Sequence, residues 1–240
     1  MRIAHGFGNS LRRLPRALEG PVDLVETDVR FQGGKIVVRH ERKPLPLPLL
    51  IDEKSSLNIG RDHKWRLVLS RWYIALVGKS LALEEVLARA KGKRGLLLDL
   101  KGKYGSREEG LARALAELLG RMDMEEQATF CGQNWPLLEH LRAAAPHLKV
   151  HHSIDNNEQL KTFQAILEGE PIRGVCLNHS IIERPLIERF KGLGMAIYAW
   201  TIDDLQRAQE LLELGVDGII SNSLEMLGLL SDSPRQERQA

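Results

Sequence analysis

The side chains in this sequence that can do acid–base or metal chemistry fall at the ends of short aliphatic runs. His5 ends the first such run, Glu26 and Asp28 end the second, and Asp99 follows a run of three leucines. Because Glu26 and Asp28 are two positions apart, a strand conformation points both carboxylates to one face. Three carboxylates gathered at one edge of a sheet would repel one another unless a cation lay between them. All-oxygen ligation of this kind suits Mg²⁺ or Ca²⁺ better than zinc.

Two histidines and a lysine complete this set. His5 and His40 are both expected beside the carboxylates, and near neutral pH such a pair supplies one proton acceptor and one proton donor. Lys101, two residues after Asp99, adds positive charge for an anionic substrate. A hard metal, a histidine pair and a lysine together indicate cleavage of a phosphodiester.

The elements that must position these side chains alternate along the chain. Short aliphatic or β-branched runs predict strands at 3–5, 22–29, 35–39, 95–100, 128–131, 149–152, 174–177, 195–200 and 218–221. Stretches of helical period predict helices at 81–90, 108–119, 135–145, 157–167, 184–190 and 203–214. Alternation of this kind implies βα units around parallel strands. Periodicity alone leaves two arrangements open, a closed barrel and an open doubly wound sheet.

One connection departs from this alternation. Only six residues, 30–35, separate the apolar run that ends at Val29 from the run Ile36–Arg39, which is too short for a crossover helix. Gly33-Gly34 within this gap predicts a hairpin whose second strand returns antiparallel beside the first. A two-residue turn would place His40 opposite Thr27 and point the imidazole away from the carboxylates. One extra residue, as in a glycine bulge, would place His40 opposite Asp28, and we predict this bulged register.

The composition is that of an ordinary globular protein. Of the 240 residues, 43% are apolar and 28% are charged, with 34 basic and 32 acidic side chains giving a net charge of +2. This balance supplies no strong basic field, so nucleic acid is not expected as a partner. No run approaches the roughly 18 apolar residues of a membrane span, and the first residues lack the apolar core of a signal peptide. Two cysteines, Cys131 and Cys176, form neither a disulfide framework nor a zinc site, which favours a reducing, cytoplasmic location.

The length allows one barrel of about 250 residues or two smaller domains. Segment 41–77 breaks the alternation and opens with Pro44, Pro46 and Pro48, which forbid a helix there. We therefore expect a small insertion after the hairpin rather than a second domain. The expected organisation is a single barrel over residues 1–230, followed by a flexible polar tail at 231–240.

Several motifs in combination resemble those of the glycerophosphodiester phosphodiesterases, TIM-barrel enzymes related to the phosphatidylinositol-specific phospholipases. The motifs are Ile3-Ala4-His5, Val25-Glu26-Thr27-Asp28-Val29, Val37-Val38-Arg39-His40, Asp99-Leu100-Lys101, Ala199-Trp200-Thr201-Ile202 and Gly215-Val216-Asp217-Gly218-Ile219-Ile220. The resemblance covers most of the chain and implies an α/β fold of the TIM (β/α)8 barrel type. It also implies that Glu26, Asp28 and Asp99 hold a divalent metal, Mg²⁺ or Ca²⁺ with Mn²⁺ as a further option. His5 and His40 would act as base and acid, and Lys101 would contact phosphate.

The activity implied by the resemblance is metal-dependent hydrolysis of a small glycerophosphodiester to glycerol 3-phosphate and an alcohol. In the family, the glycerol hydroxyl of the substrate can attack phosphorus to form a cyclic phosphate, which water then opens. Trp200 is expected to form an apolar wall of the glycerol pocket. A lysophospholipase D-type activity and a phosphomonoesterase on the same barrel remain alternatives. The sequence does not indicate an oligomeric state.

The sequence departs from the family pattern at three places: Gly6, Asp99, and Gly8-Asn9-Ser10, where the family has Glu-Asn-Thr. The first two suggest a further alternative. Gly6 stands where the family has an arginine that contacts phosphate, so Arg30, Arg39 or Lys103 would have to supply that positive charge. We include Arg39 among the expected substrate-binding residues. Asp99 stands where the family has a glutamate, and its shorter side chain suits a looser site with more water. Both departures leave open a catalytically weak barrel that binds a phosphorylated metabolite.

Overall fold

The computed structural model describes residues 1–40, 49–53, 66–68, 72–76, 81–167 and 172–230. The strands are β1 (Arg2–Ala4), β2 (Leu24–Gln32), β3 (Lys35–Val38), β4 (Leu49–Glu53), β5 (Arg66–Val68), β6 (Trp72–Leu76), β7 (Leu81–Ala82), β8 (Gly95–Leu100), β9 (Ala128–Gly132), β10 (Lys149–Ile154), β11 (Gly174–Asn178), β12 (Ala196–Trp200) and β13 (Gly218–Ser221). The helices are α1 (Leu14–Leu18), α2 (Leu83–Ala90), α3 (Glu108–Met122), α4 (Trp135–Ala144), α5 (Asn157–Ile166), α6 (Arg184–Gly192), α7 (Leu205–Glu213) and α8 (Leu224–Leu229). Three short 3₁₀ turns also occur in these ranges, η1 (Phe7–Asn9), η2 (Gly105–Arg107) and η3 (His179–Ile181). The expected tail at 231–240 lies outside the described residues.

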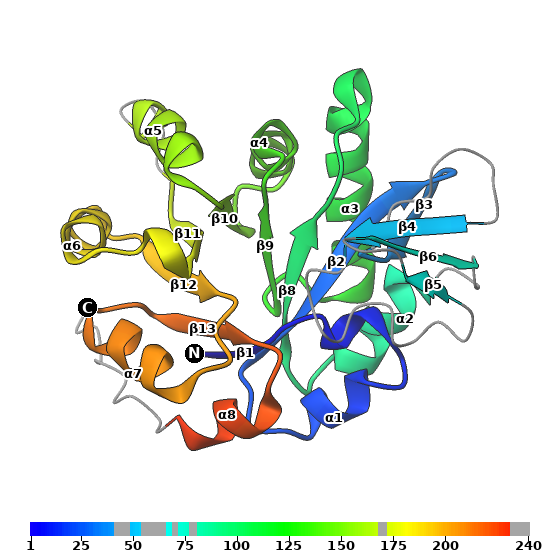
Figure 1. Ribbon diagram of the computed structural model, residues 1–240. Coiled ribbons are helices and arrows are strands. Elements are labelled where there is room, and N and C mark those ends of the chain that lie inside the picture. The colour runs from blue at the N-terminus through cyan, green and yellow to red at the C-terminus, as the bar shows by residue number, and fades with distance from the viewer. Residues whose placement is uncertain (41–48, 54–65, 69–71, 77–80, 168–171, 231–240) are drawn as a thin grey trace.

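Eight parallel strands of the described chain close into a barrel. Their order around the ring is β1, β2, β8, β9, β10, β11, β12 and β13, and β13 pairs in turn with β1. Figure 1 shows the helices arranged around the outside of this ring. The predicted TIM barrel is therefore confirmed, and the open doubly wound sheet is excluded by the pairing of β1 with both β2 and β13.

The alternation of side chains along each strand divides the core into two parts. On β8, Leu96, Leu98 and Leu100 face outward and pack in the large cluster beneath the helices. Leu97 faces inward, where it belongs to a separate cluster in the barrel interior. Asp99 lies two residues further along the same face. An inward-facing polar residue near the carboxyl end of a barrel strand is therefore directed toward the mouth of the barrel.

Side-chain caps start several helices directly after the strands. Asn134 accepts a hydrogen bond from the amide of Leu137 at the start of α4, and Asn156 accepts from Glu158 and Gln159 at the start of α5. Asp204 caps α7 and Ser223 caps α8 in the same way. Such caps satisfy amide groups that the first helical turn leaves unpaired, and they hold the connection between strand and helix in one conformation.

The hairpin between β2 and β3 has a different register from the predicted one. Val29 pairs with Val38 and Gln32 pairs with Lys35, which leaves Gly33-Gly34 as a two-residue loop. Both glycines have positive φ, 56° and 72°, as a turn that matches the strand twist requires. The bulged register was therefore wrong, because the two glycines close the hairpin without an extra residue.

Other boundaries differ from the sequence expectations by a few residues. Residues Leu81–Ala82 form β7, which pairs antiparallel with β3, so α2 begins only at Leu83. α7 begins at Leu205 rather than at 203, because Asp204 is its N-cap. The short helices α1 and α8 were not predicted. They have five and six residues, too few for a helical period to show clearly in the sequence.

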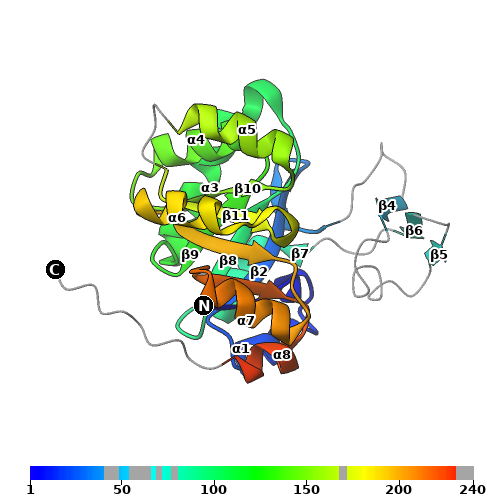
Figure 2. The ribbon, with the colours of Figure 1, turned by 60° about the vertical axis from the view of Figure 1, so that its left-hand side comes forward.

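The strands of the segment expected as an insertion pair with one another. β6 lies between β4 and β5 in an antiparallel sheet that shares no pairing with the barrel among the described residues. Figure 2 shows these three strands beside the barrel. In the described part of the chain, no helix has the length and apolar character needed to cross a membrane.

Candidate active site

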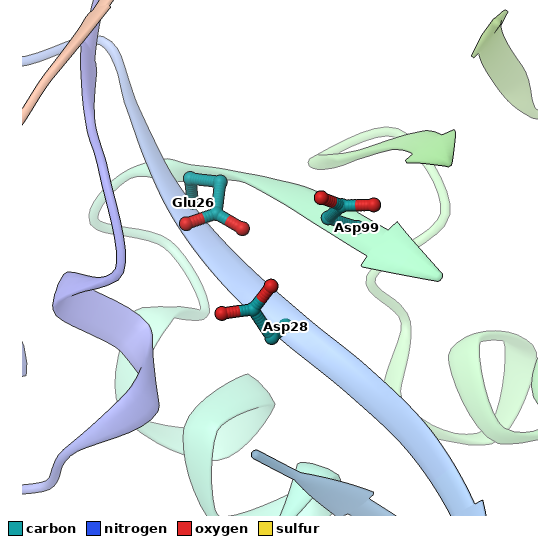
Figure 3. Close-up of side chains that lie close together, drawn as sticks. All are labelled: Glu26, Asp28 and Asp99. Carbon is teal, nitrogen blue, oxygen red and sulfur yellow. The ribbon is translucent and has the colours of Figure 1, made fainter. Parts of the chain in front are cut away.

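Strand register gathers three carboxylates at the mouth of the barrel. β2 and β8 run parallel with Asp28 opposite Asp99, and Glu26 lies two residues before Asp28 on the same face. One oxygen from each of the three carboxylates lies within 4.8 Å of the others. Figure 3 shows Glu26 and Asp28 extending from β2 toward the space that Asp99 of β8 also faces. The structure thus brings together the three residues expected to hold a metal.

The carboxylate of Glu26 is buried and only partly compensated. The residue is 3% exposed, and Oε2 accepts a hydrogen bond from the amide of Gly6 at 2.5 Å. Oε1 is buried and has no hydrogen-bond partner among the residues that the structure describes. Burial, followed by the neighbouring charges of Asp28 and Asp99, raises the pKa of Glu26 well above its usual value. A nearby cation would stabilise the ionised form of this buried carboxylate, so the site favours cation binding.

Lys101 compensates the other two carboxylates. Its Nζ lies 2.5 Å from Asp99 Oδ2 and 3.2 Å from Asp28 Oδ1. Burial works against the charged ammonium, but Asp99, Asp28 and Glu26 outweigh it and raise the pKa of Lys101 well above its usual value. Three carboxylates and one ammonium leave an excess of negative charge when all are ionised, and a divalent cation would offset that excess.

Residues of the loop after β1 donate hydrogen bonds to two of the carboxylates, those of Glu26 and Asp28. Asn9 donates from Nδ2 to Asp28 Oδ2 at 2.5 Å, and its Oδ1 accepts from the Asp28 amide at 2.8 Å. Burial would raise the pKa of Asp28, but the charges of Lys101, His40 and His5 and the bond from Asn9 hold it below its usual value. Asn9 was not identified from the sequence. It is part of the segment Gly8-Asn9-Ser10, which departs from the family pattern.

Gly8 allows this loop to approach β2 closely. A Cβ added at Gly8 would lie 1.7 Å from Thr27 Oγ1 and 3.1 Å from the carbonyl oxygen of Glu26. Thr27 is fully buried and cannot move aside easily. The missing side chain at Gly8 is therefore what lets Gly6 and Asn9 reach the carboxylates of Glu26 and Asp28.

His5 stands beside Glu26 and is anchored from its other side. Its Nε2 lies 4.0 Å from Glu26 Oε2, and its Nδ1 lies 3.0 Å from Asn222 Oδ1. Asn222 in turn contacts Asp203, which also accepts from the hydroxyl of Ser221 at 2.7 Å. Burial lowers the pKa of His5, and the charges of Lys101 and His40 add to this effect against the opposing charge of Asp28. His5 is therefore neutral near pH 7.

His40 reaches the same site by a bend rather than by strand register. β3 ends at Val38, and the amide of Arg39 donates to the Asp28 carbonyl at 3.0 Å, so Arg39 lies opposite Asp28. The chain bends at His40, which lines the cavity above the carboxylates. Its charge acts on both Asp28 and His5.

The structure does not bring Arg39 to the cavity. Its side chain is 6% exposed, and its guanidinium donates to Gln32 Oε1 at 3.4 Å. Arg30 lines the cavity instead, with Nη2 donating to the His40 carbonyl at 2.9 Å, and Lys103 lines it as well. Arg30 and Lys103 therefore carry positive charge on the cavity wall, where Arg39 was expected to do so.

One cavity of about 1130 Å³ is lined by most of these groups, namely His5, Glu26, Arg30, His40, Asp99, Lys101, Lys103, Asp203 and Asn222. Trp200, at the end of β12, forms part of its wall and donates from Nε1 to the carbonyl of Cys176 at 3.1 Å. The thiols of Cys131 and Cys176 lie at the floor, in the interior cluster that also contains Leu97. The volume is sufficient for a small organic phosphate.

The donor set fits a hard divalent cation. All three candidate ligands are carboxylates, their oxygens converge, and Glu26 Oε1 is a buried acceptor with no partner in the described part of the chain. Oxygen ligands of this kind suit Mg²⁺, Ca²⁺ or Mn²⁺. The nearest sulfur ligands, Cys131 and Cys176, do not belong to this group of converging atoms.

Comparison with known sequences agrees with this geometry. The sequence profile of the glycerophosphoryl diester phosphodiesterase family matches residues 4–226. A glycerophosphodiester phosphodiesterase of Arabidopsis thaliana is 26% identical over 243 residues, covering 95% of this chain and 73% of that protein. A glycerophosphodiester phosphodiesterase of Caldanaerobacter subterraneus subsp. tengcongensis is 24% identical over 233 residues, covering 91% of this chain and 90% of that protein.

Solved structures show the same fold. A glycerophosphodiester phosphodiesterase from Parabacteroides distasonis superposes with a TM-score of 0.70 at 22% identity, covering 94% of each chain. A phosphodiesterase from Oleispira antarctica, solved in complex with its product sn-glycerol-3-phosphate, has a TM-score of 0.67 at 19% identity and covers 92% of each chain.

The class of this protein follows from the fold, the site and the family match together. It is a TIM-barrel phosphoric diester hydrolase. Within that class, the chain belongs to the glycerophosphoryl diester phosphodiesterase family, as its sequence motifs suggested.

Proposed function

We propose that this enzyme hydrolyses small glycerophosphodiesters to glycerol 3-phosphate and an alcohol, with a divalent metal and two histidines. The observation that carries the proposal is the convergence of Glu26, Asp28 and Asp99 in a cavity that His5 and His40 also line. The product bound by the Oleispira antarctica phosphodiesterase supports glycerol 3-phosphate as the product here.

The two histidines divide the proton transfers between them. His5 is neutral near pH 7 and takes the proton from the attacking hydroxyl, while His40 protonates the leaving alkoxide as the P–O bond breaks. When the nucleophile is the 2-hydroxyl of the glycerol moiety, the first product is a cyclic phosphate, and water opens it with the proton transfers reversed. One water molecule is consumed overall for each diester cleaved.

Glu26, Asp28 and Asp99 would hold the metal, with Mg²⁺, Ca²⁺ and Mn²⁺ all compatible with the ligand set. A bound cation acts as a Lewis acid on the phosphoryl oxygens. Lys101 already lies at the edge of this cluster, so a small shift of its ammonium group toward the cavity would bring it to a phosphate. Arg30 and Lys103 add positive charge to the wall, and Trp200 provides the apolar surface for the glycerol carbons.

The proposal is tested by release of glycerol 3-phosphate from glycerophosphocholine in Mg²⁺, Ca²⁺ or Mn²⁺, for the wild type and for His5→Ala and His40→Ala. We expect activity in at least one metal, its loss with chelator, and a fall of about 10²- to 10⁴-fold in each variant. His140→Ala is the matched control, because His140 is exposed on α4 outside the cavity. Activity that survives both active-site substitutions would contradict the mechanism.

A panel of substrates decides among the alternatives. Cleavage of a lysophospholipid or a simple phosphomonoester in preference to glycerophosphodiesters would favour one of the related activities. Binding of glycerol 3-phosphate without turnover in any metal would favour a barrel that binds a phosphorylated metabolite.

We also propose a single barrel domain over 1–230 and a cytoplasmic location, the latter on the two free thiols.

A further inference from the structure

A chain of hydrogen bonds connects His5 to a carboxylate that the proposed mechanism does not use. Asp203 follows β12 and Asn222 follows β13, the strand that pairs with β1, so both lie at the carboxyl ends of neighbouring barrel strands. Asn222 Nδ2 donates to Asp203 Oδ2 at 2.9 Å, and Asn222 Oδ1 lies 3.0 Å from His5 Nδ1. All three residues face the same cavity.

The orientation of the Asn222 amide follows from Asp203. An ionised carboxylate only accepts hydrogen bonds, so the NH₂ group of Asn222 must face Asp203 and its oxygen must face His5. Burial would raise the pKa of Asp203, but the hydrogen bonds from Asn222 and Ser221 outweigh it and keep the pKa below its usual value. Asp203 is therefore ionised throughout the neutral range.

Asn222 Oδ1 is an acceptor, so the neutral imidazole of His5 must carry its proton on Nδ1. The lone pair then lies on Nε2, the nitrogen that faces Glu26 Oε2 at 4.0 Å and the metal-binding side of the cavity. With the opposite tautomer, Nε2 would carry a proton and could accept none from a substrate.

We propose that Asp203 and Asn222 are positioning residues that fix the tautomer of His5 and so make Nε2 the basic nitrogen. Neither residue need touch the substrate; both act through the imidazole. This inference rests on the proposed role of His5 as the base.

The geometry predicts how each substitution acts. Asp203 Oδ1 accepts from Ser221 Oγ at 2.7 Å and from the amide of Asn222 at 2.8 Å. In Asp203→Asn these two donors keep the amide oxygen in place, so the new NH₂ group faces the NH₂ group of Asn222. The side-chain amide of Asn222 must then rotate by half a turn, so that its NH₂ group donates to His5 Nδ1. The imidazole proton consequently moves to Nε2.

The double substitution Asp203→Asn with Asn222→Asp reverses the hydrogen bonds between the two side chains. In this double variant the NH₂ group introduced at position 203 donates to the carboxylate introduced at position 222, whose second oxygen accepts from His5 Nδ1. The tautomer of the wild type returns. Asn222→Asp alone sets two carboxylates against each other, so rescue by the pair is not expected from independent structural effects.

The experiment combines turnover with long-range ¹H–¹⁵N spectra of histidine-labelled protein at pH 8, with and without Mg²⁺, with His5 assigned from His5→Gln. We expect Nδ1–H in the wild type and the double variant, and Nε2–H in Asp203→Asn. We also expect kcat to fall about 10²-fold in Asp203→Asn with little change in KM, and to recover in the double variant. Asp204→Asn is the matched control, since it removes the neighbouring charge but keeps an N-cap for α7.

The spectra separate this inference from the proposed function. If the wild type cleaves no diester but the tautomers change as described, the positioning role stands and the proposed reaction fails. An Nδ1–H tautomer retained in folded Asp203→Asn would overturn the positioning role, whatever the activity. The role would also be overturned if the double variant had the same unfolding temperature as the wild type but recovered neither the Nδ1–H tautomer nor kcat.

Discussion

Asp28 of β2 lies directly opposite Asp99 of β8, and the ammonium of Lys101 contacts both carboxylates. Two like charges in such positions destabilise a sheet unless something compensates them. Lys101 therefore occupies the position of a counterion at the cluster that we expect to bind a metal. A cation that binds there must compete with the lysine for the same oxygens.

Replacing Lys101 by methionine is expected to tighten metal binding and to weaken catalysis. Removing a positive charge within 4 Å of two ligands favours a divalent cation, and we expect its affinity to rise at least about tenfold. The loss of the phosphate contact should lower kcat about 10²-fold. Calorimetric titration with Mn²⁺ and steady-state kinetics measure the two effects.

Lys103→Met is the control for this prediction, because Lys103 lines the same cavity without an ion pair to the three carboxylates in the structure. It should change metal affinity much less. Weaker metal binding in Lys101→Met than in the wild type would show that the lysine does not compete with the metal.

Replacing Glu26 by glutamine is expected to stabilise the protein after metal has been removed by a chelator. The folded-state pKa of Glu26 is raised above 4.5, so the native state binds more protons than the unfolded state above that pH. Its contribution to stability therefore decreases as the pH rises from about 4.5 toward the raised pKa. We expect Glu26→Gln to gain about 0.5–2 kcal/mol at pH 8, and less at pH 5.

Thermal or urea unfolding at both pH values checks this prediction. In saturating Mg²⁺ the order should reverse, because the wild type gains the free energy of metal binding and the variant loses a ligand. An equal metal-induced stabilisation of the two proteins would exclude Glu26 as a ligand.

Gly8→Ala is expected to destabilise the protein by about 1–3 kcal/mol, the usual cost of overpacking. The new methyl group would meet Thr27 Oγ1 at 1.7 Å, and the loop would have to move away from β2. Because the same loop carries Gly6 and Asn9 to the carboxylates, metal affinity should fall as well. Urea unfolding and metal titration test the two effects.

Gly110→Ala provides the comparison for Gly8→Ala. Gly110 lies within α3, where an added Cβ meets nothing within 4 Å. Alanine there should stabilise the helix by about 0.5–1 kcal/mol. Similar effects of the two substitutions would mean that the close approach at Gly8 is unimportant.

The pH dependence of the reaction should reflect the lowered pKa of His5. Burial is its main cause, and a bound cation would lower the pKa further. Since His5 must be neutral to accept a proton, kcat/KM should fall as the pH drops through a value below 6.5. In Lys101→Met this acid limb should move to higher pH, because a positive neighbour is lost. Profiles at saturating metal measure it, and an acid limb above pH 6.5 in the wild type would contradict the prediction.

The sequence predicted the alternating βα units and the gathering of polar residues because both depend on local patterns, whereas the closed barrel was implied by the family resemblance. β8 and β13 have the predicted bounds, and the positions of Glu26, Asp28 and Asp99 follow from the two-residue period of a strand. The hairpin register failed because both turn geometries satisfy the same Gly33-Gly34 signal. His40 reaches the cavity through a bend that no periodicity encodes.

The residues that sequence reasoning missed act through contacts distant in the chain. Asn9, Asn222 and Asp203 carry no motif of their own, and their roles depend on which strands are neighbours. One signal was available for Asn222 and Asp203. Each follows a predicted strand at its carboxyl end, the rule that also selected Asp99. Arg39 was expected in the site as a substitute for the arginine absent at position 6, but its side chain is buried and donates to Gln32 instead.

His5 and Asn222 are separated by 217 positions, and β1 completes the ring only by pairing with β13. During synthesis, the residue proposed as the base therefore leaves the ribosome long before the amide that orients it. An unfinished chain, or one cut before β13, lacks both the Asn222 amide beside His5 and the pairing that closes the ring. We therefore expect a product that lacks β13 to be inactive rather than partly active.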